Sequence, residues 1–223
     1  MTTNLSSART RIKICGLTRA QDVRACAQSG ADALGFVFYP PSKRFMSAVH
    51  AAELCADLPA FISTVALFVN PDPQEVKDVI HTLRPSLLQF HGDEDPGFCE
   101  AFGVPYLKAF RVGGPSLDTA ANVAKTCQEF SQAAGWLFDS YTPAFGGSGQ
   151  GFDHALLSAV SSAQGAARPM ILSGGLNAQN ARVAVQGLKP WAVDVSSGVE
   201  ESPGVKSAQK VDEFVQAIHQ ASV

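Results

Sequence analysis

Short runs of β-type residues alternate with helical stretches along the chain, and this alternation restricts the possible folds more than any other feature. The runs begin 22, 31, 22, 20, 29, 35 and 21 residues apart, which suits a strand, a loop, a short helix and a second loop repeated eight times. They are predicted at residues 11–15, 33–38, 64–69, 86–90, 106–110, 135–139, 170–173 and 191–195. Strands and helices in alternation favour a parallel sheet.

The segments between these runs carry the signals of helix ends. Asp72 and Asp95 each stand directly before a proline, an arrangement typical of an N-cap and a first helical residue. Residues Thr18 to Gln21 are interpreted as a capping box, and Gly30 as the stop of that helix. Asn177 is predicted to cap the helix that follows the seventh strand.

A parallel sheet of this size is either an open, doubly wound sheet or a closed (β/α)8 barrel. In the first run, Arg11, Lys13 and Cys15 share one face while Ile12 and Ile14 share the other. A barrel turns its apolar face outward beneath the helices and accepts polar groups inside. An open nucleotide-binding sheet would need GxGxxG after the first strand, where this chain has CGLTRA, and GxxxxGK[ST] does not occur. We therefore predict a single-domain α/β protein, a (β/α)8 TIM barrel.

We predict that the barrel spans residues 11–223 and that residues 1–10 form a flexible tail. The composition of the chain limits the kinds of partner that it can bind. The net charge is -3 without basic blocks, which argues against nucleic acid or an anionic membrane as a partner. No apolar run approaches the roughly 18 residues that a bilayer span needs, and the first residues lack the apolar segment of a secretory signal. The five cysteines form no CxxC pair, and all except Cys15 are predicted to be buried hydrophobes. We expect a cytoplasmic protein that binds a small molecule; the composition names no protein partner.

Polar residues and glycines gather where the predicted strands end, and that face carries the active site in such barrels. Ser173, Gly174 and Gly175 follow the seventh strand, and Ser197 and Gly198 follow the eighth. Glycine turns ahead of a helix expose backbone N–H groups, and loops seven and eight are where these barrels hold phosphate. Glycines that only make tight turns are the alternative, but their presence at both expected strands favours a phosphate site.

Seven motifs extend this interpretation. They are KICGLT at 13–18, GFVFYPPSKR at 35–44, ALFVN at 66–70, LLQFHGDE at 87–94, FDS with GGSG at 138–149, ILSGGL at 171–176 and VDVSSGVEESPG at 193–204. Together they resemble the phosphoribosylanthranilate isomerase family of tryptophan biosynthesis, over nearly the whole chain. The resemblance implies a cofactor-free Amadori rearrangement of N-(5-phosphoribosyl)anthranilate, an aminoaldose, to 1-(2-carboxyphenylamino)-1-deoxyribulose 5-phosphate, an aminoketose.

The resemblance also implies roles for individual residues. Cys15 would be the general base, Asp139 the general acid, and Arg44 the contact of the anthranilate carboxylate. The phosphate would be held by Gly147, Gly174, Gly175, Ser197 and Gly198. His91 and Asp194, which end the fourth and eighth strands, are further candidate substrate contacts.

The chemistry of these roles leaves two questions open. Free cysteine is only a few per cent thiolate at neutral pH, so a base of this kind needs a neighbouring cation that lowers its pKa. Lys13 lies on the same strand face, but in a barrel that pairs the first strand with the eighth, Asp194 could neutralise it instead. His91 could hydrogen-bond substrate or only order its loop. The acidic residues 93–95 are interpreted as a helix-start charge pattern and not as a metal site.

Other phosphosugar barrels fit the sequence less well. A pentose-phosphate epimerase would resemble a metal enzyme with histidine ligands on several strands, which this chain lacks. Indole-glycerol-phosphate synthase would be expected to offer a lysine acid and a longer N-terminal helical extension. A catalytically silent anion-binding module would be favoured by loss of Cys15 or Asp139, and both are present. We predict an enzyme without metal or cofactor.

Overall fold

The structure is a computed structural model of the chain, and it describes residues 9–142, 151–161 and 168–221. Within these ranges the strands are β1 (Arg11–Cys15), β2 (Ala33–Val37), β3 (Ser63–Phe68), β4 (Leu87–Phe90), β5 (Tyr106–Val112), β6 (Gly135–Ser140), β7 (Met170–Leu172) and β8 (Ala192–Val195). They pair in parallel, in sequence order, and close into a barrel where β1 meets β8. The predicted (β/α)8 barrel is confirmed, and each strand boundary lies within two residues of its prediction.

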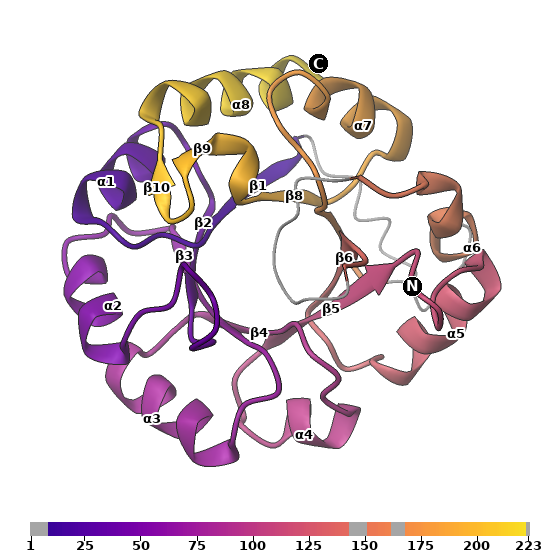
Figure 1. The fold of residues 1–223 in the computed structure, drawn as a ribbon, viewed down its shortest axis with the longest axis horizontal. Helices are drawn as coiled ribbons and strands as arrows, with labels where there is room; N and C mark the ends of the chain where they lie inside the picture. The colour runs from indigo at the N-terminus through magenta and orange to yellow at the C-terminus, as the bar shows by residue number, and fades with distance from the viewer. Residues whose placement is uncertain (1–8, 143–150, 162–167, 222–223) are drawn as a thin grey trace.

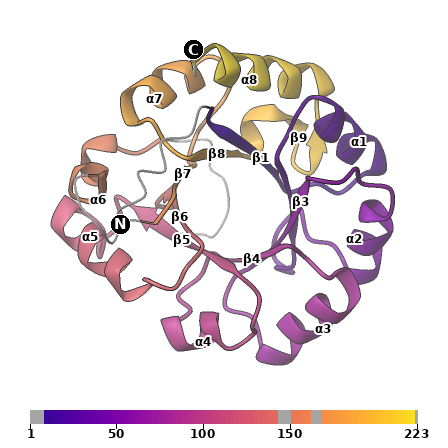
Figure 2. The same ribbon diagram turned by 180° about the vertical axis from the view of Figure 1, so that it is seen from behind.

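A ring of helices surrounds the barrel (Figures 1 and 2). The helices are α1 (Ala20–Gln28), α2 (Ala48–Cys55), α3 (Pro73–Leu83), α4 (Pro96–Glu100), α5 (Ala120–Glu129), α6 (Ser158–Ser161), α7 (Ala181–Leu188) and α8 (Ala208–Ala221). Two 3-10 helices, η1 (His154–Leu157) and η2 (Ser197–Val199), follow β6 and β8. A small antiparallel hairpin of β9 (Glu200–Ser202) and β10 (Val205–Lys206) precedes α8.

Side-chain alternation along the strands separates two apolar layers. Ile12 and Ile14 of β1 face outward and are fully buried beneath the helices, in the large core that also takes Phe36, Phe68 and Phe138. A second, smaller cluster fills the interior near the amino-terminal ends of the strands. It comprises Leu107, Ala109, Leu137, Ile171 and Ala192. Because the interior is filled there, the hollow end of the barrel is the one where the strands terminate.

The helix-end predictions are confirmed at three positions and wrong at two. Gly30, with a φ of 96°, directly follows Ser29, the C-cap of α1, as predicted. Asp72 and Asp95 cap α3 and α4 as predicted. The capping box at Thr18 is wrong, since α1 begins after Arg19 and the Thr18 hydroxyl donates to Gly204 O at 2.5 Å. Asn177 is not the N-cap of α7 either, because Asn180 holds that position. The Asn177 side chain accepts from the N–H groups of Gln179 and Asn180, in the turn that leads into α7.

The start of the described chain is attached to the barrel. The Arg9 guanidinium donates to Asp32 at 2.8 Å, and Thr10 is buried with its hydroxyl 3.4 Å from Pro190 O. Of the flexible tail predicted at 1–10, Arg9 and Thr10 are therefore held by the barrel, and residues 1–8 lie outside the described residues. None of the helices in the described ranges has the length and hydropathy that a bilayer span requires.

Candidate active site

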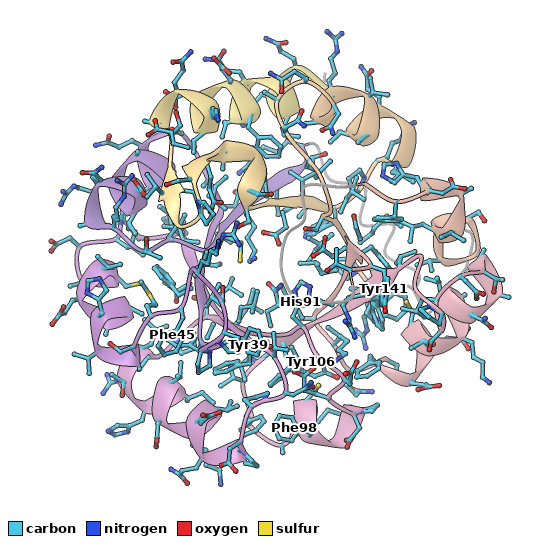
Figure 3. All side chains as sticks on the ribbon, in the orientation of Figure 1. Tyr39, Phe45, His91, Phe98, Tyr106 and Tyr141 are labelled. Carbon is cyan, nitrogen blue, oxygen red and sulfur yellow. The ribbon has the colours of Figure 1, made fainter. Side chains whose placement is uncertain are left out.

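One cavity opens at the carboxyl ends of the strands and brings together nine of the ten predicted site residues. These are Cys15, Arg44, His91, Asp139, Gly174, Gly175, Asp194, Ser197 and Gly198. The tenth, Gly147, lies outside the described residues. His91 stands near the centre of the barrel opening, with Tyr39 of the β2–α2 loop farther out (Figure 3). The barrel therefore gathers side chains from six separate loops and strand ends around one space.

Cys15 ends β1 and points into the interior, where it is 5% exposed and packs with Val37, Leu67 and Val69. Gly35 is its neighbour on β2, and a Cβ atom there would lie 2.8 Å from the sulfur. The missing side chain at Gly35 thus provides the space for the thiol. Burial raises the pKa of Cys15, and nearby cations only partly offset this effect. The sequence analysis expects a lowered pKa for this thiol, whereas the pKa of Cys15 is raised in the structure.

The partner of Lys13 is Asp194, which resolves the first open question. The register of β1 and β8 sets the two residues opposite each other, and Lys13 Nζ donates to Asp194 Oδ1 at 2.8 Å. Both side chains are about 95% buried inside the barrel, at 5% and 6% exposure. Burial alone would lower the pKa of Lys13, but Asp194 and Cys15 raise it above its usual value. Lys13 is therefore a cation shared between a carboxylate and the thiol.

Asp139 lies near the end of β6 and is oriented from two sides. Its Oδ1 accepts from the Ser140 N–H at 2.8 Å, and its Oδ2 lies 3.3 Å from His91 Nε2. The opposite ring nitrogen of His91 lies 3.1 Å from Gln89 Nε2. An amide nitrogen donates, so in this arrangement the near ring nitrogen of a neutral His91 would accept, and the ring proton would lie on Nε2, 3.3 Å from Asp139 Oδ2. His91 therefore orders the carboxyl group, in addition to any contact it makes with substrate.

Gln89 and Glu200 contribute to the site and were missed by the sequence reasoning. Gln89 is fully buried on β4 and lines the cavity, and its Oε1 atom has no hydrogen-bond partner among the residues that the structure describes. Its position two residues before His91 puts both side chains on the same strand face, a signal that could have found it. Glu200 binds the Arg44 guanidinium in a bidentate pair at 2.8 and 2.7 Å.

Close backbone contacts shape the two predicted phosphate loops. Gly174 and Gly175 both have positive φ, at 84° and 65°, and a Cβ on Gly174 would lie 2.4 Å from Ser140 Oγ. A Cβ on Gly198 would lie 1.9 Å from Leu176 O. The loops after β7 and β8 therefore touch each other through glycine, and both line the cavity.

The acidic residues at 93–95 have three different functions. Asp95 caps α4 as the helix-start interpretation predicts, and Asp93 pairs with Arg111 at 3.0 Å. For Glu94 that interpretation is wrong: its buried carboxylate accepts from Lys108 Nζ at 2.7 Å, because Lys108 points inward from β5 at the same level. Among the described residues, no group of three or more His, Cys, Asp or Glu side chains is arranged so that it could hold a metal ion.

Three of the four structural cysteines are buried as predicted: Cys26, Cys99 and Cys127 are at most 1% exposed. Cys55 departs from the prediction, because it lies at the last turn of α2 and is only partly buried against the core. Burial raises the pKa of Cys55 to about 11. None of the five cysteines forms a disulfide bond.

Comparison with known proteins places the chain in a family. The family model described as N-(5'phosphoribosyl)anthranilate (PRA) isomerase matches residues 12–217. An N-(5'-phosphoribosyl)anthranilate isomerase of Bordetella bronchiseptica is 57% identical over 210 residues, which cover 94% of this chain and 96% of the relative. Its counterpart in Pseudomonas putida is 44% identical and covers 95% of this chain and 98% of the relative.

Solved structures agree. Phosphoribosyl anthranilate isomerase from Thermotoga maritima matches with a TM-score of 0.85 at 36% identity, over 95% of this chain and 99% of the other. A crystal structure of phosphoribosyl anthranilate isomerase in complex with reduced 1-(o-carboxyphenylamino)-1-deoxyribulose 5-phosphate matches with a TM-score of 0.81 at 33% identity, with the same coverage. The chain belongs to the N-(5'-phosphoribosyl)anthranilate isomerase family.

Proposed function

We propose that the cavity isomerises N-(5'-phosphoribosyl)anthranilate with Cys15 as general base and Asp139 as general acid. By family membership the chain is an aldose–ketose isomerase of tryptophan biosynthesis, and the product is 1-(2-carboxyphenylamino)-1-deoxyribulose 5-phosphate. The observation that carries the assignment of roles is a single cavity lined by both the thiol and the carboxyl group, with the glycine loops after β7 and β8 at its edge.

Ring opening is the first step. The anilino nitrogen forms a double bond to the anomeric carbon while the bond from that carbon to the ring oxygen breaks. Asp139 gives its proton to the departing ring oxygen, which becomes a hydroxyl group. The hydrogen bond from Ser140 N–H and the contact of His91 Nε2 with Asp139 Oδ2 at 3.3 Å position the carboxyl group for this transfer. His91 would thereby hold the acid in place even without touching the sugar.

Proton abstraction is the second step. The iminium ion acidifies the proton on the adjacent sugar carbon, and the Cys15 thiolate removes it to leave an enolamine. The enolamine then gains a proton at the former anomeric carbon and loses one from its enol oxygen, which gives the aminoketose. Lys13 and Lys206 stabilise the thiolate as it forms, since both lower the pKa of Cys15 against the larger opposite effect of burial.

Binding determinants lie at the two ends of the cavity. Arg44 offers a planar guanidinium to the anthranilate carboxylate. Backbone groups at Gly174, Gly175, Ser197 and Gly198, together with Gly147 outside the described residues, are proposed to hold the phosphate. Asp194 and His91 remain candidate contacts of the sugar hydroxyls, and both line the cavity.

The proposal includes a cytoplasmic site of action, which the five unpaired cysteines support because structural thiols persist in reducing compartments. It also includes independence of metal and cofactor, because proton transfers alone complete the rearrangement. A chelator in the assay tests the second point: turnover should be unaffected by its presence.

Substitution of the two proton-transfer groups tests the mechanism. Consumption of freshly prepared N-(5'-phosphoribosyl)anthranilate is followed by its fluorescence. We expect Cys15→Ser and Asp139→Asn each to abolish turnover, while Cys55→Ser, the same atom exchange at a cysteine outside the cavity, changes mainly stability. Full isomerase activity in Cys15→Ser would refute the assignment of the base.

A further inference from the structure

A buried cluster of two cations and one carboxylate borders the cavity, formed by Arg44, Glu200 and Lys206. Arg44 Nε and Nη2 donate to the two oxygens of Glu200 at 2.8 and 2.7 Å, and Lys206 Nζ donates to Glu200 Oε1 at 2.8 Å. The side chains are 13%, 5% and 1% exposed. Burial would raise the pKa of Glu200, but Arg44 and Lys206 hold it below its usual range. Two basic side chains therefore share one carboxylate beside the cavity, and burial lowers the pKa of Lys206.

Hydrogen bonds of the β9–β10 hairpin hold Glu200 in place. The β9–β10 hairpin that supplies Glu200 and Lys206 is attached to the start of α1: Lys206 N–H donates to Asp22 at 3.0 Å, and Arg19 donates to Lys206 O at 3.2 Å. In Figure 1 the hairpin lies between α1 and α8, beside the opening of the barrel. Gly204 N–H donates to Glu200 Oε1 at 3.2 Å as well. The carboxylate is therefore a fixed point of the fold.

The opposite side of Arg44 is also confined. Its side chain passes over Gly16, where an added Cβ would lie 2.4 Å from Arg44 Cδ. Gly16 has a positive φ of 77°, so the chain turns away beneath the arginine. Arg44 is therefore restricted by the contact with Gly16 on one side and by the bidentate pair with Glu200 on the other.

The occupied edge of the guanidinium determines which edge is free. Arginine has five N–H donors, and Glu200 engages Nε and one donor of Nη2, so Nη1 and the second donor of Nη2 remain for a ligand. Arg44 lines the cavity together with Cys15 and Ser42. A buried ion pair contributes little net stability compared with an apolar replacement, because desolvation offsets the attraction. Orientation of the free edge is what this pair adds.

We propose that Glu200 is a positioning residue, which holds Arg44 so that its free edge faces the cavity and thereby sets the preference for a substrate with a carboxylate beside the anilino nitrogen. This inference rests on the proposed function, since it concerns the carboxylate of that substrate. Glu200 is not among the residues that line the cavity, whereas Arg44 is, so the effect of Glu200 passes through Arg44.

Two substrates separate this role from a merely structural one: N-(5'-phosphoribosyl)anthranilate and its carboxylate-free analogue N-(5'-phosphoribosyl)aniline. In Glu200→Gln we expect KM for the anthranilate substrate to rise about tenfold or more, with kcat within about threefold, as loss of a charge-assisted contact predicts. KM for the aniline substrate should stay within about twofold of wild type. Arg44→Ala should show the same pattern, and the double variant should be no worse than Arg44→Ala, because the two residues act as one unit.

A matched control is a buried glutamate that is paired with a lysine but does not line the cavity. Glu94→Gln makes the same exchange beside Lys108, at a residue that does not line the cavity, and should lower stability while it leaves the ratio of the two KM values unchanged. If Glu200→Gln does not fold, Glu200→Asp keeps the charge but shortens the side chain. It should still reduce the preference for the anthranilate substrate, because the bidentate geometry is lost.

The outcomes distinguish the two proposals. A wild-type enzyme that turns over neither substrate refutes the proposed function. An active wild type, together with an unchanged KM ratio in both Glu200 variants, refutes only the positioning role. Equal increases of both KM values, or kcat losses without a change in the ratio, also overturn it, because a structural defect does not discriminate between the substrates.

Discussion

The contact between the loops after β7 and β8 gives a sharp test of phosphate binding. A Cβ atom placed on Gly198 would lie 1.9 Å from Leu176 O and 3.0 Å from Leu176 C. Both are backbone atoms, which cannot move aside as the end of a flexible side chain can. Gly198→Ala must therefore push the two loops apart by about 1 Å, since carbon and oxygen do not approach closer than about 3 Å.

A displacement of this size removes hydrogen bonds to a ligand. An N–H···O contact of about 2.9 Å that lengthens by about 1 Å is no longer a hydrogen bond. Hydrogen bonds to charged groups contribute about 1.5–3 kcal/mol each, which corresponds to roughly 10- to 150-fold in affinity. We expect KM of Gly198→Ala to rise by about that factor, with a parallel loss of inhibition by inorganic phosphate.

Gly187→Ala is the matched control, because it adds the same methyl group in the neighbouring unit. Gly187 lies in α7 with nothing within 4 Å of an added Cβ. Alanine there should raise the free energy of unfolding by up to about 1 kcal/mol and leave KM unchanged. Steady-state fluorescence kinetics and thermal unfolding measure both variants. A KM for Gly198→Ala within about twofold of wild type, in a folded protein, would contradict the assignment of phosphate binding to this loop.

Three further predictions follow from buried charges. Because burial raises the pKa of Cys15, its alkylation by iodoacetamide, followed by mass spectrometry, should have a midpoint above the ordinary value of about 8.5, and a lower midpoint would contradict the reasoning. Lys108→Met leaves the buried Glu94 carboxylate without its counter-ion, with only the N–H groups of Asn70 and Gly92 among the described residues donating to it, so urea unfolding should show a loss of about 3–5 kcal/mol. Because the pKa of Glu200 is lower in the folded protein than in the unfolded chain, where it is about 4.3, the ionised carboxylate stabilises the fold above that pH. This stabilisation is lost as the pH falls through the folded-state pKa. Glu200→Gln should therefore flatten the stability curve between about pH 5 and 3, and an unchanged slope would argue against the pair.

The barrel could be predicted because its signals are local. Alternation in Arg11–Cys15 assigns each side chain to the interior or to the helices, and the strand ends follow from the same pattern. The rule that barrel sites lie at the carboxyl ends of strands then selects Cys15, His91 and Asp139 for one cavity, where the structure has them. No knowledge of distant contacts is needed for these steps.

Predictions that depended on a distant partner were less reliable. Thr18 has the sequence of a cap, yet its hydroxyl bonds Gly204, which is 186 residues away. The partner of Lys13 depends on the register with which β8 closes the barrel against β1, and the sequence left two answers open. A local sequence pattern predicts which kinds of group a side chain can bond. Which of these groups lies within hydrogen-bond distance depends on the fold.

Glu200 illustrates where sequence reasoning ends. Pro203 and Gly204 predict a turn, and a hairpin around that turn would pair Glu200 with Lys206, so this contact could have been found. Their burial could not, because charged residues beside a turn are solvated by default. In the fold, the hairpin is attached to α1, and Glu200 and Lys206 are 5% and 1% exposed, so two charges expected at the surface instead support the arginine. A comparison of charged turn residues across (β/α)8 barrels should therefore weigh what the following segment packs against, since this decides whether such a charge is a solvated group or part of the site.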